Sequence, residues 1–409
     1  MQNFLVRRAT QMASPRNFAF AAFAAVLVVL LTQIFSATAL FVDFRYIWMA
    51  GRLWGEGISP YELVFTTRAA SDFPEWTYPL LVWVYPPCWY PFALAFAQAP
   101  VDVAHRTASI LALLSTIVGI WVVWRSSQTV ARRPDWALLA IMAFILSASV
   151  ATVTIREGAA GFVAQLGLAF IIAALLRPNQ FMMTIGIALS VFKPQIGLPM
   201  CVALLLIGGN IRPLILAAIC DLLLSAPAFL LHPPVEMARA IIDLSSKYAG
   251  AEINLPNAMT GVGYFLANAG LYDLSTGSST LAAMAASSAT ALWVRYTDDN
   301  EASIRRKIAF AIPCFIVGIV SMHPGDYIAV LFVIPLVLNF DRVSIAICSL
   351  CYLMIWRAEN VMTFLLHQPV EMSVGLISLG STGLMLIAVV QVVAKRRDNQ
   401  ISQPPNHAP

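Results

Sequence analysis

The residues best suited to chemistry stand between the first long apolar run and the polar segment after it. The stretch 41–63 holds three acids, two arginines and six aromatic residues. Asp43 is the acid nearest the apolar run, so water can keep it ionised while it stays close to a bilayer. A carboxylate there is a candidate general base for a lipid-borne substrate. The structural alternative is that Asp43 caps the helix that follows.

Two arginines in the same stretch favour an anionic ligand. Arg45 and Arg52 follow Asp43 by two and nine residues. Either they bind phospholipid headgroups without selectivity, or they hold the phosphate of a substrate. The sequence leaves both interpretations open.

A second candidate, Lys193, lies near the middle of the apolar run 181–207. A charge at that depth costs several kcal/mol unless it is paired or reaches a water-filled cavity, which makes it a functional residue by default. Pro194 breaks the helix, so we expect two short helices that meet at a polar pocket beside Gln195. The alternative is a structural lysine that extends its amine to the interface.

Polar residues in two later segments complete the set. His323 and Asp326 lie in a turn between apolar runs and could bind an acceptor hydroxyl or a phosphate. Pro-Gly-Asp is also a good turn former, so this turn has a structural explanation as well. Asn254 and Asn257 offer neutral hydrogen-bonding groups suited to sugars, although such residues also cap loops.

The elements that must position these residues are membrane helices. Of 409 residues, 59% are hydrophobic and 11% are charged, whereas soluble domains carry roughly 25% charged residues. Apolar runs long enough to cross a hydrocarbon core of about 30 Å recur along the chain. We predict an all-α polytopic membrane protein of about 12–13 membrane segments. Residues 1–394 form one domain, and 395–409 a disordered cytoplasmic tail.

The predicted apolar segments alternate with loops of two kinds. Residues 41–78 form a first outer loop with short interfacial helices, and residues 232–268 form a second outer loop. The segment from Tyr78 to Gln98 contains several prolines and either crosses the bilayer or returns to the same side. The clear apolar runs are 18–40, 107–124, 136–155, 161–176, 181–207, 213–231, 278–294, 308–322, 327–338, 343–356 and 373–393.

Basic loops predict the orientation of the chain, because lysine and arginine favour the cytoplasmic side. The loops placed there contain Arg125, Arg132, Arg133, Arg177, Arg212, Arg295, Arg305, Arg306, Lys307, Arg342, Lys395, Arg396 and Arg397. Both termini are then cytoplasmic, and Asp43, Arg156-Glu157, Lys193 and His323 share the outer face. The net charge of +4 reflects this topology, so we expect no nucleic-acid partner.

The motifs follow one order along most of the chain. Asp43 and its aromatic neighbours lead to Gly57-Ile58-Ser59-Pro60-Tyr61, and Tyr85-Pro86-Pro87 follows. Lys193-Pro194 and the turn from Ser321 to Asp326 come later. This pattern resembles the bacterial polyprenyl-phosphate-mannose-dependent mannosyltransferases of glycosyltransferase family 87. The chain departs from that pattern at Glu157-Gly158, where the family commonly has Gly-Gln.

The resemblance implies a GT-C fold in the bacterial inner membrane. It also implies transfer of a sugar, most often mannose, from a polyprenyl-phosphate donor to a lipid or glycan hydroxyl on the outer face, without a cofactor or metal. Asp43 would deprotonate the acceptor, and Lys193 with Arg45 or Arg156 would face the departing phosphate. His323 and Asp326 would orient the acceptor. The other expected substrate contacts are Tyr46, Trp48, Glu157, Gln195 and Asn257.

Two other functions fit part of the pattern. A transporter or flippase of lipid-linked sugars also places charges and broken helices at membrane depth. However, the Lys193-Pro194 break has no counterpart in the other half of the chain. An O-antigen ligase would favour a large outer loop with several arginines, whereas 232–268 contains only Arg239. The sequence indicates neither the acceptor nor whether the sugar is mannose or a pentose such as arabinose.

Overall fold

The computed structural model describes residues 14–36, 42–73, 82–128, 133–208, 211–249, 259–271, 276–320, 328–358 and 370–393. Within these ranges the chain forms helices and no strand, which confirms the all-α prediction. The first half contains α2 (Pro15–Ser36), α3 (Val42–Gly55), α4 (Val64–Asp72), η1 (Pro87–Trp89), α5 (Tyr90–Ala97), α6 (Val101–Ser127), α7 (Asp135–Leu146), α8 (Ser149–Glu157), α9 (Gly161–Leu176), α10 (Gln180–Ser190) and α11 (Pro194–Leu206). The second half contains α12 (Arg212–Leu231), α13 (Pro234–Ala249), α14 (Val262–Asn268), α15 (Thr276–Thr297), α16 (Glu301–Ile319), α17 (Ile328–Leu331), α18 (Ile334–Val337), α19 (Arg342–Trp356) and α20 (Val370–Val393).

Four of the described helices are long and apolar enough to cross a membrane, namely α2, α6, α12 and most of α20. The pair α7–α8 makes a fifth if it is counted as one span bent by 71°. Several other apolar helices are shorter than the ~20 residues that a crossing needs. The predicted 12 or 13 membrane segments therefore stay a prediction, while the polytopic helical class is confirmed.

Local sequence signals account for most helix boundaries. The run 161–176 forms α9 with the predicted bounds, and the Lys193-Pro194 break separates α10 from α11. Side-chain oxygens cap three helix starts: Asn179 for α10, Asn300 for α16 and Asp341 for α19. Each oxygen accepts hydrogen bonds from backbone N–H groups that have no partner within the helix.

Three predicted segments differ from the structure. The run 136–155 is broken between α7 and α8, and the run 327–338 holds only the short helices α17 and α18. The second outer loop is largely helical, because α13 occupies 16 of its residues. The proline-rich segment ends in α5, whose eight residues span about 12 Å and cannot cross a bilayer.

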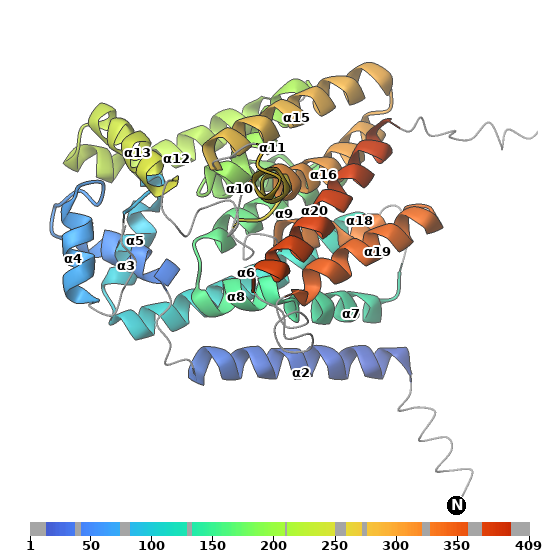
Figure 1. Ribbon diagram of the computed structural model, residues 1–409, viewed down its shortest axis with the longest axis horizontal. Helices are drawn as coiled ribbons and strands as arrows, with labels where there is room; N and C mark the ends of the chain where they lie inside the picture. Colours follow the sequence, from blue (N-terminus) through green and yellow to red (C-terminus); the bar gives the residue numbers. More distant parts are fainter. Residues whose placement is uncertain are drawn as a thin grey trace, which may run out of the picture.

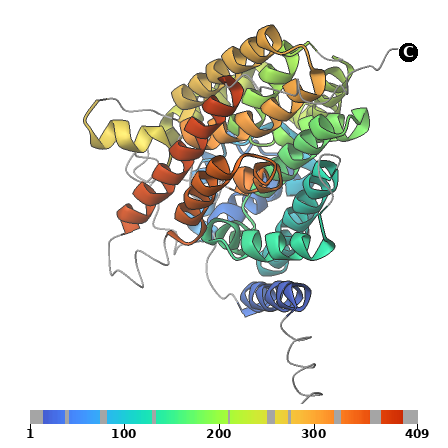
Figure 2. The same ribbon diagram turned by 90° about the vertical axis from the view of Figure 1, so that its right-hand side faces the viewer.

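The core lies among α6, α9, α10, α11, α16, α19 and α20, whose buried side chains form one large apolar cluster. Helix α9 packs against both α6 and α10, and α16 packs against α20 and α9. Helix α2 lies outside this core against α7, α6 and α8, and Figure 2 shows it end-on beneath the bundle. Exposed apolar side chains such as Phe35 on α2 and Leu223 on α12 suit contact with lipid.

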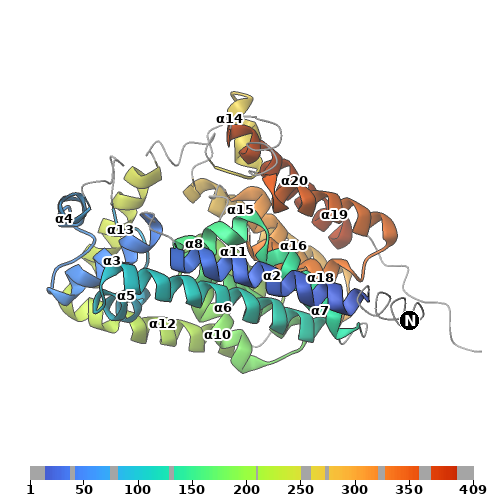
Figure 3. The same ribbon diagram turned by 90° about the horizontal axis from the view of Figure 1, so that it is seen from below.

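The molecule has two distinct ends. Helices α3, α4, α5 and α13 gather at one of them, which we call the α3 end (Figures 1 and 3). At the other end α6 terminates, α7 begins, α15 turns into α16, α19 begins and α20 terminates (Figure 1). We call this the basic end, because the predicted cytoplasmic arginines flank these helix ends. Helix α2 begins at the basic end, so the described chain starts and finishes on the same side.

Candidate active site at the α3 end

Helix α3 carries the predicted base and is largely buried. Phe44, Ile47 and Leu53 are fully buried in an apolar cluster that also includes residues of α4, α5 and α13. A Cβ atom at Gly51 would collide with the Ala93 carbonyl of α5, so the two backbones are in direct contact. The amphipathic pattern that predicted an interfacial helix is thus used to pack α3 against protein on its apolar side.

Asp43 lies in the first turn of α3, which begins at Val42. Its backbone is described, whereas its side chain lies outside the described part of the structure. A carboxylate in a first turn is stabilised by the helix dipole, so a structural contribution from Asp43 coexists with the proposed chemical one. What the structure adds is the neighbourhood of this turn.

The first turn of α3 meets α6 and the end of α8. The ring centroids of Phe44 and His105 are 5.6 Å apart. His105 Nε2 lies 2.9 Å from the carbonyl oxygen of Arg156, and Ser109 Oγ donates to the same oxygen at 3.3 Å. A carbonyl oxygen only accepts hydrogen bonds, so His105 Nε2 carries the proton. The backbone of Arg156 therefore lies near the first turn of α3, and the roles of Arg156 and Glu157 stay predictions.

This corner of the molecule is cationic. Arg45 and Arg106 both interact electrostatically with His105, and Arg156 is exposed with its Nη2 3.9 Å from Glu157 Oε1. The Arg45 guanidinium also lies 4.5 Å above the ring of Phe73. Two arginines near one histidine, with Arg156 on the adjoining turn of α8, suit an anionic group, because arginines can donate charge-assisted hydrogen bonds to phosphate oxygens.

Gly158 shapes the end of α8. Its φ of 58° lies in the left-handed region, where glycine is favoured at a helix C-terminus. A Cβ atom at this position would lie 3.0 Å from Ala108 Cβ. The glycine that departs from the family pattern thus lets α8 turn sharply while it packs closely on α6. This packing keeps the Arg156 carbonyl within reach of His105.

Two of the predicted aromatic contacts are part of the core. The Trp48 indole is buried, and its Nε1 donates to the Ala99 carbonyl at 2.9 Å. Tyr46 is half-buried and stacks on Phe65, with ring centroids 5.9 Å apart and planes inclined by 10°. Sugar stacking by Tyr46 and Trp48 stays a prediction, and both side chains have a packing role.

Two hydrogen bonds and one ring contact between aromatic residues, which together we call the aromatic relay, join the three sequence motifs. Tyr61 Oη donates to the Tyr85 carbonyl at 2.7 Å, and the Tyr85 and Trp89 ring centroids are 6.2 Å apart. Trp89 Nε1 then donates to the Phe192 carbonyl at 3.2 Å. The relay therefore runs from Gly57-x-x-Pro60-Tyr61, through Tyr85-Pro86-Pro87, to the residue before Lys193.

The Tyr61 hydroxyl acts in this relay as a neutral donor. Burial raises the pKa of Tyr61 well above its ordinary value. The phenol therefore keeps its proton at all physiological pH values. It can hold the Tyr85 carbonyl throughout that range.

Lys193 lies at the break between α10 and α11, and its side chain is buried. Its carbonyl accepts from the Ile196 N–H at 2.8 Å, which starts α11. A Cβ atom on Gly197 would lie 2.7 Å from the Ser190 carbonyl oxygen, so the backbones of α10 and α11 are in direct contact across the break. Phe192 belongs to the same apolar cluster as Phe44, which brings the Lys193 segment to the α3 end. Gln195 is half-buried beside it.

Asn257, His323 and Asp326 lie outside the described residues, so their roles stay predictions. The chain that flanks them is described. Gly261 approaches the carbonyl of Gly318, which would lie 3.1 Å from a Cβ atom at that position. The described residues that come shortly after 250–258 and shortly before 321–327 are thus in contact.

Sequence reasoning missed His105. It lies just before the apolar run 107–124 and outside the motifs that predicted the site. The available signal was the pair His105-Arg106 at the polar start of a long apolar run. Among the described residues no three histidine, cysteine or acidic side chains lie close enough together to bind a metal ion. The expected independence from metal stays a prediction.

The apolar bundle and its polar α3 end define a helical membrane protein with a candidate site at one end. Residues 83–319, more than half of the chain, match the family model of Glycosyltransferase family 87. The chain belongs to this family, as its sequence motifs predicted, and it is a membrane glycosyltransferase. The match includes His105, Arg156 and Lys193, whereas Asp43 precedes it and Asp326 follows it.

One solved structure is similar to the chain along most of its length. It is the crystal structure of ArnT from Cupriavidus metallidurans bound to undecaprenyl phosphate. The sequences are 15% identical, the similarity covers 93% of this chain and 78% of ArnT, and the TM-score is 0.45. The comparison with curated proteins finds no match.

Proposed function

We propose that this glycosyltransferase moves mannose from a polyprenyl-phosphate donor to a hydroxyl of a lipid or glycan acceptor at the α3 end, with inversion. The observation that supports this most strongly is the meeting of the first turn of α3 with His105 and Arg156. A candidate base and a group of arginines lie together at the end of a lipid-facing bundle. A donor with a lipid tail and a phosphate needs this combination.

The chemistry requires a base more than an acid. The leaving group is a phosphate monoester, which departs as a stable anion with little protonation. Asp43 accepts the proton of the acceptor hydroxyl while that oxygen attacks the anomeric carbon from the face opposite the phosphate. A positioned base contributes a factor on the order of 10²–10⁴ to the rate. Attack from the opposite face gives inversion.

The cations act on the departing phosphate. Arg45, Arg156 and Lys193 face the charge that develops as the glycosidic bond breaks, and fixed donors there lower the transition-state energy. Glu157 and Gln195 assist donor binding. On the acceptor side, His323, Asp326 and Asn257 position the incoming hydroxyl, and Tyr46 and Trp48 contribute aromatic surface. The proposed location is the inner membrane of a bacterium, with the α3 end outward and both termini cytoplasmic.

The test is transfer from synthetic polyprenyl-phosphate-mannose by the purified full chain in a native lipid extract containing EDTA. We expect Asp43→Asn to lower the rate of transfer by about 10²–10⁴. The matched control is Asp72→Asn, which changes an exposed acid at the end of α4; it should transfer like the wild type.

Three outcomes would contradict parts of this proposal. Equal rates for wild type and Asp43→Asn would remove Asp43 as the base. Loss of wild-type activity in EDTA, restored by a divalent cation, would contradict metal independence. If the wild type transfers no sugar but moves the donor across a sealed vesicle membrane, the protein is a transporter of the lipid-linked sugar.

A further inference from the structure

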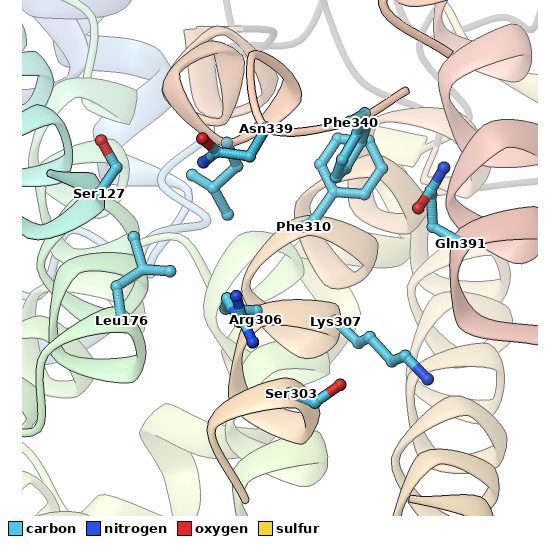
Figure 4. Close-up of a pocket in the computed structure, with 10 residues that line it drawn as sticks. Ser127, Leu176, Ser303, Arg306, Lys307, Phe310, Asn339, Phe340 and Gln391 are labelled. Carbon is cyan, nitrogen blue, oxygen red and sulfur yellow. The ribbon is translucent and has the colours of Figure 1, made fainter. Parts of the chain in front are cut away.

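A cavity with an apolar lining and several polar side chains lies at the basic end, opposite the candidate active site. Its volume is about 90 Å³, and it opens between the ends of α6, α9, α16 and α20 and the turn that follows α18. Arg306, Lys307, Asn339 and Gln391 provide its polar groups, and Phe310 and Phe340 are among its apolar walls. Figure 4 shows Arg306 and Lys307 on one side of the cavity and Asn339 across from them.

Arg306 supplies positive charge that no nearby acid neutralises. It is half-buried, and its Nε donates to the Ala302 carbonyl at 3.2 Å. Within the described chain it forms no ion pair. By contrast, Lys307 Nζ lies 3.2 Å from Asp298 Oδ2, and Arg305 Nη1 lies 2.9 Å from Glu301 Oε2. A half-buried guanidinium with only a carbonyl partner has donors left for an anion.

The opposite wall adds hydrogen-bond donors. Arg133 Nη2 donates to Asn339 Oδ1 at 2.8 Å, which fixes the orientation of the amide because only its oxygen can accept. The two N–H groups of the Asn339 amide therefore remain as donors. Arg133 also brings a second positive charge close behind this wall. The cavity thus combines the Arg306 guanidinium and an amide donor, beside a lysine that is already paired with Asp298.

The position of the cavity favours a membrane lipid over a soluble anion. His105 of the candidate active site and Ser127 at the cavity both belong to α6. Their separation in sequence corresponds to about 33 Å along a helix, close to the ~30 Å of a hydrocarbon core. The cavity therefore lies at headgroup depth on the other side of the membrane. Its apolar walls suit the glycerol and first acyl carbons of a phospholipid.

We propose that this cavity binds the phosphate of an anionic phospholipid such as phosphatidylglycerol, with Arg306 as the principal contact and Lys307 and Asn339 in support. Basic pockets between membrane helices on the cytoplasmic side recognise anionic headgroups in this way. The site is separate from the donor site and lies in the opposite leaflet.

The test measures lipid retention by native mass spectrometry of the full chain, titrated with phosphatidylglycerol. We expect one tightly held lipid, and Arg306→Gln should weaken its binding about tenfold or more. The matched control is Arg16→Gln, an exposed arginine at the start of α2 on the same end; it should bind like the wild type. Arg306→Lys keeps the charge and should retain most of the affinity.

Several results would overturn the proposal. Equal weakening by Arg306→Gln and Arg16→Gln would mean that the lipid is held only by general surface charge. Equal retention of neutral diacylglycerol would mean that the phosphate is not recognised. Displacement of the lipid by glycerol 3-phosphate at the same concentration would make this a site for soluble phosphates.

Discussion

The hydrogen bond from Tyr61 to Tyr85 permits a prediction whose size follows from the structure. Tyr61→Phe removes one hydroxyl and leaves the ring, which is 4% exposed, in place. The bond is 2.7 Å long, the preferred length for an O–H···O interaction. Loss of a buried donor leaves the Tyr85 carbonyl without that partner, which costs about 1–3 kcal/mol. We expect the free energy of unfolding to fall by that amount.

The assay is reversible unfolding in mixed micelles with increasing SDS, followed by tryptophan fluorescence. Tyr296→Phe is the control, because Tyr296 is 89% exposed and should change the stability by less than about 0.5 kcal/mol. Sugar transfer by Tyr61→Phe should fall far less than in Asp43→Asn, because Tyr61 supports the site and touches no reacting atom. If Tyr61→Phe unfolds at the same SDS concentration as Tyr296→Phe, the hydroxyl does not hold the relay together.

Two further predictions concern opposite ends of the molecule. His105→Phe keeps a ring against Phe44 but loses the donor to the Arg156 carbonyl, so kcat/KM for sugar transfer should fall about 3–10-fold. His105→Gln retains an N–H donor and should recover most of that loss. Equal loss in both variants would refute this positioning role. For Asp298, partial burial alone would raise the pKa, but hydrogen bonds from Ser303, Asn300 and Lys307 outweigh burial and lower the pKa. The ionised Asp298 therefore stabilises the folded protein above the unfolded-state pKa of about 3.9. This stabilisation disappears as the pH falls through the folded-state pKa. Asp298→Asn should therefore lower the free energy of unfolding by on the order of 1 kcal/mol at neutral pH, a difference that vanishes in acid; a pH-independent difference would contradict the assigned cause.

The elements that the sequence predicts well are those whose causes are local. Helix α9 has the predicted bounds because a continuous apolar run ends at Arg177. The α10–α11 break follows directly from Pro194. The bend between α7 and α8 has a distant cause: Trp356 Nε1 donates to the Phe144 carbonyl and to Ser147 Oγ, both at 3.0 Å. No glycine or proline marks that bend, so the sequence alone could not reveal it.

In the candidate site, too, some residues are predictable from local sequence and others depend on contacts between distant helices. Arg156-Glu157 and Lys193 were predicted to share a face with Asp43, because basic loops determine which helix ends lie together. Helix α13 was missed although Met237 and Leu244, which the structure buries, are separated by two helical turns and indicate an amphipathic helix. The pair His105-Arg106 was a weak signal in the sequence, and the importance of His105 on α6 shows in its contacts with Phe44 of α3 and Arg156 of α8. Periodicity reports which face of a helix is apolar, and says nothing about which helix it meets.

The aromatic relay also constrains the order in which the protein can be completed during synthesis. Trp89 and Phe192, which its last hydrogen bond joins, are 103 residues apart. At about 5–20 residues per second, a ribosome needs several seconds to produce the intervening helices α5 to α10. During that time the Trp89 indole lacks its hydrogen-bond acceptor, the Phe192 carbonyl. Helices α3, α4 and α5 cannot yet be linked to the Lys193 segment by this bond. The contact between the α3 end and the Lys193 segment can thus form only after α10 has been synthesised, and a chain truncated before Phe192 lacks the acceptor of the Trp89 indole.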